Sequence, residues 1–392
     1  MTESEQNKAY LHWIYQTVGM GNHKLFAKLR SLGEPQEVYE MAKHGRLSDR
    51  LSDKYGRCKS SQYKHSQYKL SQYVKKAALL EESAQNYDVA AEYGRMTDRG
   101  IFFTAVGEEE YPGKLADVPD APGALYYVGR LPKNDEKAIA VIGARNCSEY
   151  GRAMARQFGD ILAGAGIQVV SGMARGIDGI AQQAVLNAGG YSLGVLGCGV
   201  DICYPRENRK LYEELIAGGG ICSEYPPGTE PRAVLFPPRN RIISGMCDGV
   251  LVIEAKERSG TLITVDMALE QGREVYAVPG RTTDPLSKGC NRLIRQGAGI
   301  VVSPQELLQE LWPGCVGKAV YEQQELPIVD DVRGRLLKLL DYQPIYIETI
   351  QRKYADAYDS HISVSELCHE LLKLCADGYA GHIGGSYYVR QG

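Results

Sequence analysis

Apolar residues recur at helical spacing near the start of the chain. Between residues 9 and 45, apolar side chains recur mostly three, four or seven positions apart: Leu11, Ile14, Tyr15 and Val18, then Leu25, Leu29 and Leu32, then Val38 and Met41. Positions three and four apart lie on one face of a helix, so this pattern predicts a helical bundle within residues 1–100. The segment 18–22, Val-Gly-Met-Gly-Asn, reads as a plain turn between helices or as a helix-hairpin-helix turn that offers amides to phosphate. The plain turn is favoured.

A five-residue repeat of Ser, Gln, Tyr and Lys follows at 61–64, 66–69 and 71–73. A period of five matches neither a helix nor a strand, so it cannot keep one face apolar. Tyr could stack on bases and Lys could meet phosphate. We nevertheless predict a surface loop or helix end without a function of its own.

From Ala138 onward, short apolar runs alternate with helical stretches. Such alternation predicts an α/β fold: a Rossmann-like parallel sheet covered by helices on both faces. The segment 102–131 predicts an extended lead-in with one or two added strands, and together these parts form a domain over residues 101–312. The expected strands are Ala138–Ile142, Gln168–Ser171, Ser192–Leu196, Gly220–Ser223, Val250–Ile253, Glu274–Val278 and Gly299–Val302.

The last part of the chain predicts a small separate domain. Residues 313–329 read as a linker, and residues 330–392 contain three helical stretches followed by a glycine-turned hairpin, which is the pattern of a winged helix. Its expected recognition helix carries Glu366, His369, Glu370 and Lys373 and is not strongly basic. A protein contact is therefore favoured over the reading of duplex DNA.

Composition narrows the class of protein. The chain has 392 residues, of which 44% are hydrophobic, enough for two or three domains. Its apolar runs are strand-sized rather than membrane-spanning and residues 1–8 are polar, so we expect a cytoplasmic protein with no membrane contact. The ten cysteines form no CxxC pair and do not cluster with histidines, which predicts reduced thiols, no metal and no cofactor. The net charge of −3 decides nothing, because nucleic acids bind local positive patches.

Candidate chemistry lies just after the predicted strands, where ligands bind in open parallel sheets. The first strand is followed by Gly143, Arg145 and a helix start at Ser148, and the second by Ser171, Gly172 and Arg175. Glycine lets a backbone approach an anion, a helix start offers N–H groups, and arginine adds charge. Each loop alone is weak evidence, because tight turns and helix caps use the same residues.

Two further segments strengthen this prediction. Ser259, Gly260 and Thr261 open a helix as a hydroxyl-rich amide cradle, and the segment 236–241, Phe-Pro-Pro-Arg-Asn-Arg, places an aromatic ring beside two guanidinium groups. Such a pair can stack a base and hold its backbone. Together, the strand ends predict an anion-binding rim.

The same segments resemble the motifs of the DprA/Smf family (DNA-processing protein A), in order, over residues 138–311. The resemblance rests on residues 141–145, 171–178, 236–245, 254–262 and 277–280, and the flanks look similar to the family's N-terminal helical domain (SAM-like or helix-hairpin-helix-like) and C-terminal winged helix. It implies a non-catalytic protein that binds and protects single-stranded DNA, loads RecA onto it during natural transformation, and forms a homodimer. It also implies a DNA site formed by Gly143, Arg145, Ser171, Gly172, Arg175, Arg206, Phe236, Arg239, Asn240, Arg241, Ser259, Gly260 and Thr261. At Arg206 the family often has lysine.

Other classes remain open at this point. A nucleoside-monophosphate hydrolase of the lysine-decarboxylase-like (LOG) type has the same fold, but it needs a glutamate soon after its glycine loop, whereas Leu262, Ile263 and Thr264 follow here. A dehydrogenase would need a GxGxxG motif, which neither Gly143 nor the segment 197–202 supplies. Glu224 and Glu254 could each act as a base, although strand-end carboxylates more often cap helices or pair with arginine. A purely structural role stays open for the terminal domains.

Overall fold

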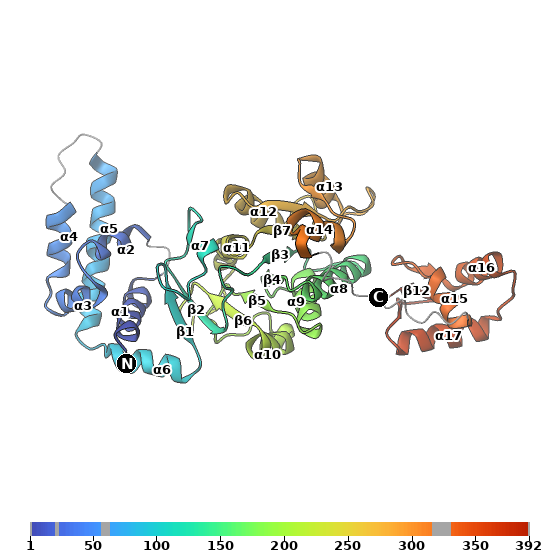
Figure 1. Cartoon of the computed structure of the whole chain (residues 1–392), viewed down its shortest axis with the longest axis horizontal. Coiled ribbons are helices and arrows are strands. Elements are labelled where there is room, and N and C mark those ends of the chain that lie inside the picture. Colours follow the sequence, from blue (N-terminus) through green and yellow to red (C-terminus); the bar gives the residue numbers. More distant parts are fainter. Residues whose placement is uncertain (1, 20–22, 56–62, 316–330, 391–392) are drawn as a thin grey trace. The chain divides into compact units, whose positions relative to one another are not determined.

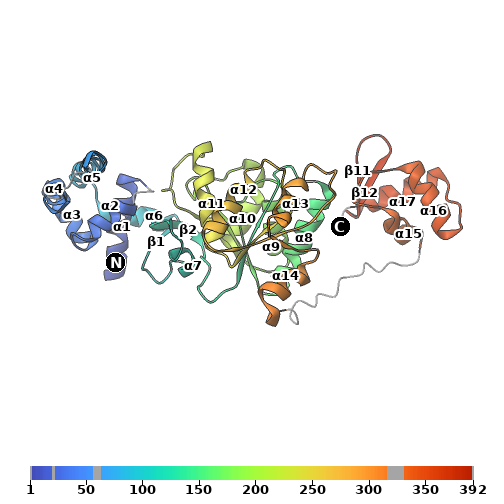
Figure 2. The same ribbon diagram turned by 90° about the horizontal axis from the view of Figure 1, so that it is seen from above.

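The computed structural model describes residues 2–19, 23–55, 63–315 and 331–390 (Figures 1 and 2). The chain divides into two compact units. Unit 1 comprises Met1–Ala138, Ser192–Cys247 and Asp266–Arg273, and unit 2 comprises Ile139–Tyr191, Asp248–Val265 and Glu274–Gly392.

A nine-stranded sheet has the order β1-β2-β6-β5-β4-β3-β7-β8-β9. The pairs β3–β7, β7–β8, β8–β9 and β5–β6 are parallel, whereas β2 is antiparallel to both β1 and β6. This confirms an α/β fold with a mostly parallel sheet, and the lead-in supplies two strands. The strands are β1 Phe102–Ala105, β2 Ala124–Gly129, β3 Ala138–Ile142, β4 Gln168–Ser171, β5 Ser192–Val195, β6 Gly220–Ser223, β7 Gly249–Val252, β8 Glu274–Ala277 and β9 Gly299–Ile300.

Unit 2 is built on helices that cover β3, β4 and β7. In α8 (Glu149–Gly164) and α9 (Ile177–Asn187), which lie side by side in both views, Phe158 and Val185 join a buried cluster with Val141 and Leu251 of the strands. Helix α14 (Pro304–Leu311) adds Leu307 and Leu308 to the same cluster. Continuous burial of β3, β4 and β7 on both faces explains why their sequences are apolar runs rather than alternating patterns. Two further helices of the α/β part are α12 Thr261–Glu270 and α13 Lys288–Arg295.

Unit 1 contains the predicted helical bundle, in which α4 and α5 run side by side (Figure 1). Trp13 is fully buried and donates its indole N–H to Ser83 Oγ at 3.1 Å, which ties α1 to α5. Glu81 of α5 accepts hydrogen bonds from Ser48 N at 2.8 Å and Ser48 Oγ at 2.7 Å, in the first turn of α4. The helices of this unit are α1 Glu3–Val18, α2 His23–Arg30, α3 Pro35–Lys43, α4 Leu47–Tyr55, α5 Tyr63–Ala84, α6 Val89–Asp98, α7 Gly113–Ala116, α10 Arg209–Gly218 and α11 Phe236–Gly245.

The Ser-Gln-Tyr-Lys repeat lies at a helix end. From Tyr63 onward it forms the first half of α5, so a period of five does not prevent a helix here. Tyr73, in the last copy, lies beneath the Lys28 ammonium, with 5.7 Å between Nζ and the ring centroid. Of the possible helix-hairpin-helix turn, residues 20–22 lie outside the described part of the chain, so the choice between the two turn types stays open.

A buried histidine makes unit 1 sensitive to acid. His12 of α1 is 3% exposed, its Nδ1 lies 3.1 Å from the hydroxyl of Tyr126 in β2, and burial lowers its pKa to about 4. A histidine in the unfolded chain has a pKa near 6.5. Between pH 6.5 and pH 4, His12 is therefore protonated in the unfolded chain but neutral in the folded protein, so acid favours unfolding. We expect stability to be fully present above pH 6.5 and to fall by up to about 3 kcal/mol as the pH approaches 4.

The measurement is the difference in thermal unfolding midpoint between the wild-type protein and His12→Gln at pH 7, 6, 5 and 4. Carboxylates titrate in both proteins, so only the histidine contribution should separate the two curves. The exposed His369→Gln serves as the control. Parallel curves for wild type and His12→Gln would show that His12 does not titrate in this way.

The C-terminal part of unit 2 has its own core. Leu336, Ile350, Leu367 and Leu371 of its three helices pack with Tyr388 of a three-stranded antiparallel sheet, whose order is β10-β12-β11. The predicted helices and hairpin are present, and β10 is an additional strand. Its elements are α15 Val332–Leu339, β10 Ile345–Tyr346, α16 Ile347–Tyr358, α17 Val364–Ala376, β11 Ala380–His382 and β12 Tyr387–Arg390. The predicted linker falls largely on residues 316–330, which lie outside the described part.

Three further observations concern the described residues only. No helix among them is both long and apolar enough to cross a membrane. No group of three or more His, Cys, Asp or Glu side chains in this part of the chain could hold a metal ion. Of the nine cysteines that the structure describes, Cys198, Cys222, Cys247, Cys290 and Cys315 are buried.

Candidate nucleic-acid interface

Three loops of unit 2 follow neighbouring strands. Strand β3 lies between β4 and β7 in the sheet, so the chain leaves β3 toward β4 on one side and later returns to β7 on the other. Such a switch of direction opens a crevice at the carboxyl ends of the strands, where α/β proteins bind ligands. The loops β3–α8, β4–α9 and β7–α12 carry Arg145, Arg175 and Ser259 respectively.

The first two loops touch through their backbones. Ile177 N donates to Ala144 O at 3.2 Å. Gly176 has φ +75°, and a Cβ at this position would collide with the carbonyl oxygens of Ala144 and Arg145. Only glycine combines this backbone conformation with so close an approach. The contact therefore holds Arg145 and Arg175 on adjoining loops, and both side chains are exposed.

Gly176→Ala is expected to lower the free energy of unfolding by at least about 2 kcal/mol, because it adds steric overlap to backbone strain. Gly189→Ala is the matched control, since Gly189 has φ +73° but nothing within 4 Å of an added Cβ. It isolates the backbone cost of about 1 kcal/mol. Urea unfolding of both variants measures the difference, and equal losses would mean that the two loops can separate freely.

Inside the β4–α9 loop, backbone amides are bound by side chains of α9. Gly172 N donates to Asp178 Oδ2 at 3.2 Å, and Met173 N donates to Gln182 Oε1 at 3.0 Å. Met173 is buried and adopts φ 51°, a conformation that non-glycine residues rarely take. Ser171 is also buried and donates to Val141 O at 2.6 Å. Ser171 and Gly172 therefore shape the loop that carries Arg175.

The β7–α12 loop is joined to the β3–α8 loop in the same way. Thr261 Oγ1 donates to Gly143 O at 3.2 Å, and Thr261 N donates to Ser259 Oγ at 3.2 Å. The next two amides, of Leu262 and Ile263, donate to carbonyl oxygens within the turn. The three N–H groups of the predicted amide cradle thus donate hydrogen bonds within the protein. The exposed guanidinium groups are therefore the main source of positive charge in these loops.

The start of α8 is occupied by a carboxylate. Glu254, at the end of β7, is 1% exposed and accepts hydrogen bonds from Ser148 N at 2.9 Å and Ser148 Oγ at 2.5 Å. Burial raises its pKa, while the hydrogen bonds from Ser148 and the charge of Arg152 oppose the rise. Ser148 Oγ also accepts from Gly151 N at 3.1 Å as the N-cap. The prediction of free N–H groups for an anion at this helix start is wrong for these amides, because the protein supplies the anion.

Unit 1 contains a separate aromatic and cationic cluster. The exposed ring of Tyr204 lies 5.2 Å from that of Phe236, and the Arg239 guanidinium lies 5.9 Å from the Phe236 ring centre. Arg239 is 5% exposed and donates to Val195 O and, at 3.2 Å, to Asn240 Oδ1. This arrangement offers an aromatic surface for stacking, and Tyr204 is a candidate that the sequence prediction did not include.

Arg241 lies in an internal ion pair. Its side chain is 9% exposed and contacts Glu224 Oε2 at 2.5 Å and Asp120 Oδ2 at 3.2 Å. Glu224 is itself 4% exposed. This guanidinium therefore holds α11 against the end of β6 and is not displayed to a ligand. Arg206, in the turn Arg206–Asn208, is exposed.

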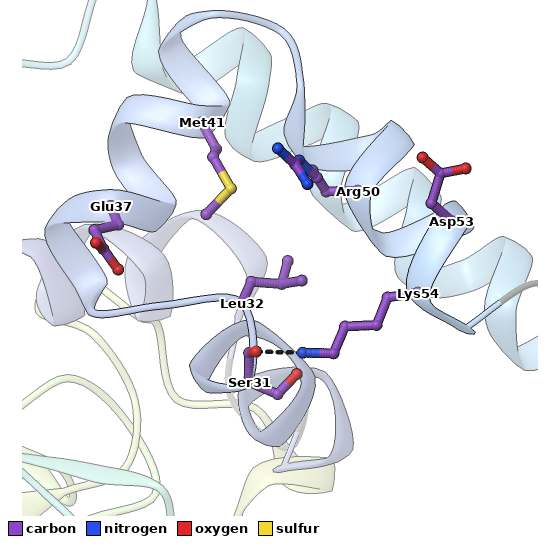
Figure 3. A pocket seen from close by; sticks show the side chains of 7 residues that line it. All are labelled: Ser31, Leu32, Glu37, Met41, Arg50, Asp53 and Lys54. Carbon is purple, nitrogen blue, oxygen red and sulfur yellow. Dashed lines mark hydrogen bonds between the residues drawn. The ribbon is translucent and has the colours of Figure 1, made fainter.

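The helical part of unit 1 has a cavity of its own (Figure 3). Its walls come from the α2–α3 turn, α3 and α4, and Lys54 donates to Ser31 O across it. None of the predicted DNA-binding residues lines it. The lining residues are Ser31, Leu32, Glu37, Met41, Arg50, Asp53 and Lys54.

The candidate acid–base groups of the α/β part form ion pairs or hydrogen bonds within the protein. Glu224 is paired with Arg241, and Glu254 accepts from Ser148. Burial raises the pKa of the Cys198 thiol to about 12 and that of Cys222 to about 12, so both stay protonated and are poor nucleophiles. These groups serve the fold, whereas the guanidinium groups of Arg145 and Arg175 are exposed.

Open α/β sheets bind their ligands in the crevice at such a switch point, and this chain carries Arg145 and Arg175 in the loops there. Residues 102–312 match the family described as DNA recombination-mediator protein A. The chain therefore belongs to this family, which confirms the resemblance found in its motifs.

Individual relatives agree. Protein Smf of Escherichia coli is 47% identical over 204 residues, which are 52% of this chain and 54% of that protein, so the match spans about half of each. The DNA processing protein DprA of Streptococcus pneumoniae is 44% identical over 202 residues, 51% of this chain and 71% of that protein. The X-ray structure of the S. pneumoniae protein aligns with a TM-score of 0.60 and 32% identity, covering 77% of this chain and 98% of that one.

Proposed function

We propose that this protein binds single-stranded DNA as a non-catalytic DNA-processing protein. The observation that carries the proposal is the joining of three loops at the switch point of the sheet, which present Arg145 and Arg175 from adjoining turns. Membership of the family supports the same conclusion. The internal use of the neighbouring amides favours a ligand held through guanidinium contacts to phosphates, as a DNA backbone would be.

Binding would combine charge neutralisation with stacking. Arg145, Arg175 and Arg206 would contact phosphates, while Phe236 and Tyr204 would stack on bases. Gly143, Ser171, Gly172, Ser259, Gly260 and Thr261 would shape the loops, Arg239 and Asn240 would support the aromatic surface, and Arg241 would hold α11. Because phosphate contacts release counterions, affinity should fall with salt and depend little on base sequence.

The finer parts of the role are proposals that follow from the family. We propose protection of DNA and loading of RecA during natural transformation, in the cytoplasm, by a homodimer. The exposed apolar side chains of Ile300, in the edge strand β9, and of Val302, two residues after it, favour self-association. We further propose the domain division 1–100, 101–312, 313–329 and 330–392, with a Rossmann-like core and a C-terminal winged helix. We propose that the winged helix contacts protein, because α17 exposes the apolar side chain of Leu372 and also carries Glu366 and Glu370.

A competition experiment separates this function from nucleotide hydrolysis. Unlabelled oligothymidine should displace a labelled oligothymidine from the protein, while a nucleoside monophosphate at the same phosphate concentration should not. Chromatography of the nucleotide after long incubation should show no released base. Release of base at a rate proportional to protein concentration, without displacement of labelled DNA by oligothymidine, would refute the proposal and favour the hydrolase.

A further inference from the structure

The carboxylate of Glu254 joins two strand-end loops of unit 2. It lies in the β7–α12 loop, two residues after the end of β7, and accepts hydrogen bonds from Ser148 N and Ser148 Oγ at the start of α8. It also fills the space over the first turn of α8, because a Cβ added at Gly151 would collide with its oxygens. The carboxylate thus takes the place that a phosphate occupies at the helix start in many nucleotide-binding folds.

Ser148 ends the loop that carries Arg145. This loop begins at Gly143, whose carbonyl oxygen accepts Thr261 Oγ1, and it continues through Ala144, whose carbonyl oxygen accepts Ile177 N. Glu254 supplies the attachment at the other end of the loop. Without the Glu254 carboxylate, the first part of the loop stays anchored, while the part between Arg145 and Ser148 loses the two hydrogen bonds from Ser148 to Glu254.

We propose that Glu254 is a positioning residue for DNA binding, which holds the β3–α8 loop so that the Arg145 guanidinium meets a phosphate. The inference rests on the proposed function. A carboxylate is not expected to help an anion bind, so a loss of affinity on removing it is the opposite of what simple charge predicts. This reversal makes the proposal testable.

The experiment is a double-variant cycle on the full chain, with anisotropy of a labelled oligothymidine as the readout. Glu254→Ala and Arg145→Ala should each weaken binding roughly tenfold, the size of one charge-assisted contact. Because both remove the same contact, the combined variant should also be weakened roughly tenfold rather than a hundredfold. Each variant should also show a salt slope that is smaller by about 0.7, the value for one phosphate on a single strand.

Glu257→Ala is the matched control, since Glu257 is an exposed carboxylate three residues further along the same loop. It should bind at least as tightly as the wild type. If Glu254→Ala does not fold, the cycle is run with Glu254→Gln, which keeps the volume and one acceptor. We expect Glu254→Gln to weaken DNA binding about threefold. When Arg145 is already alanine, Glu254→Gln should cause no further loss of affinity.

Wild-type affinity and salt slope in the Glu254 variant would overturn the inference, and so would losses that multiply with those of Arg145→Ala. Both of these results leave the proposed function intact, provided that Arg145→Ala alone weakens binding. Normal binding by Arg145→Ala would instead remove Arg145 from the site. The two failures are therefore distinguishable.

Discussion

Arg145→Glu is expected to weaken oligothymidine binding by about 10- to 100-fold while leaving the fold intact. The side chain is exposed on a loop at the switch point, so it adds little to the core. The replacement both removes a charge-assisted contact to phosphate and places a negative charge against it. Equilibrium anisotropy with labelled oligothymidine measures the loss of affinity. The free energy of unfolding, measured by thermal unfolding, should change by no more than about 0.5 kcal/mol.

The control for net charge is Arg46→Glu, which makes the same change at an exposed position ahead of α4. If affinity simply follows the total charge of the protein, both variants should lose binding equally. A much larger loss for Arg145→Glu places the contact in the β3–α8 loop, and equal losses would contradict that placement.

Arg241→Ala is expected to lower the free energy of unfolding by about 3 to 5 kcal/mol, whereas Arg145→Glu lowers the affinity for DNA and leaves the stability nearly unchanged. It would leave Glu224 buried without its partner, at a place where Glu224 Oε1 already has no hydrogen-bond partner of its own. Urea or thermal unfolding measures the loss. Reduced DNA binding should appear only under conditions in which part of the protein is unfolded.

A compensating variant distinguishes a structural pair from a ligand contact. Replacing both residues by apolar side chains of similar length, as in Glu224→Leu with Arg241→Met, should recover most of the lost stability, because no buried charge remains. It should also recover DNA binding. A double variant that is stable yet cannot bind oligothymidine would mean that the Arg241 guanidinium contacts DNA directly.

The sequence predicted the sheet well because its strands are buried on both faces. The run Ala138–Ile142 is apolar at every position, and the observed strand β3 has the expected bounds. The two-residue strand β10, Ile345–Tyr346, was missed because so short a pattern carries no periodicity. The Ser-Gln-Tyr-Lys repeat was expected in a surface loop or at a helix end, and the structure places it at the start of α5, a helix that contacts α3 and α4.

The candidate site was predicted less completely. Glycines and arginines at strand ends indicated the loops, but nothing local could show which groups use each amide. Glu254 reaches Ser148, a residue 106 positions earlier, and only the parallel pairing of β3 with β7 brings the two together. Sequence alone likewise could not show that Arg241 forms a buried ion pair with Glu224, just after β6, and Arg241 was therefore predicted as a DNA ligand. Exposure of the Tyr204 ring beside Phe236 likewise depends on the fold.

The most direct test of single-stranded DNA binding is a titration of labelled oligothymidine and of a labelled duplex of equal length at two salt concentrations. We predict tighter binding of the single strand and an affinity that falls as salt rises, by a slope of about 0.7 for each phosphate contacted. Equal affinity for the duplex, or binding that does not change with salt, would contradict a site made of arginine contacts to phosphate and aromatic contacts to unpaired bases.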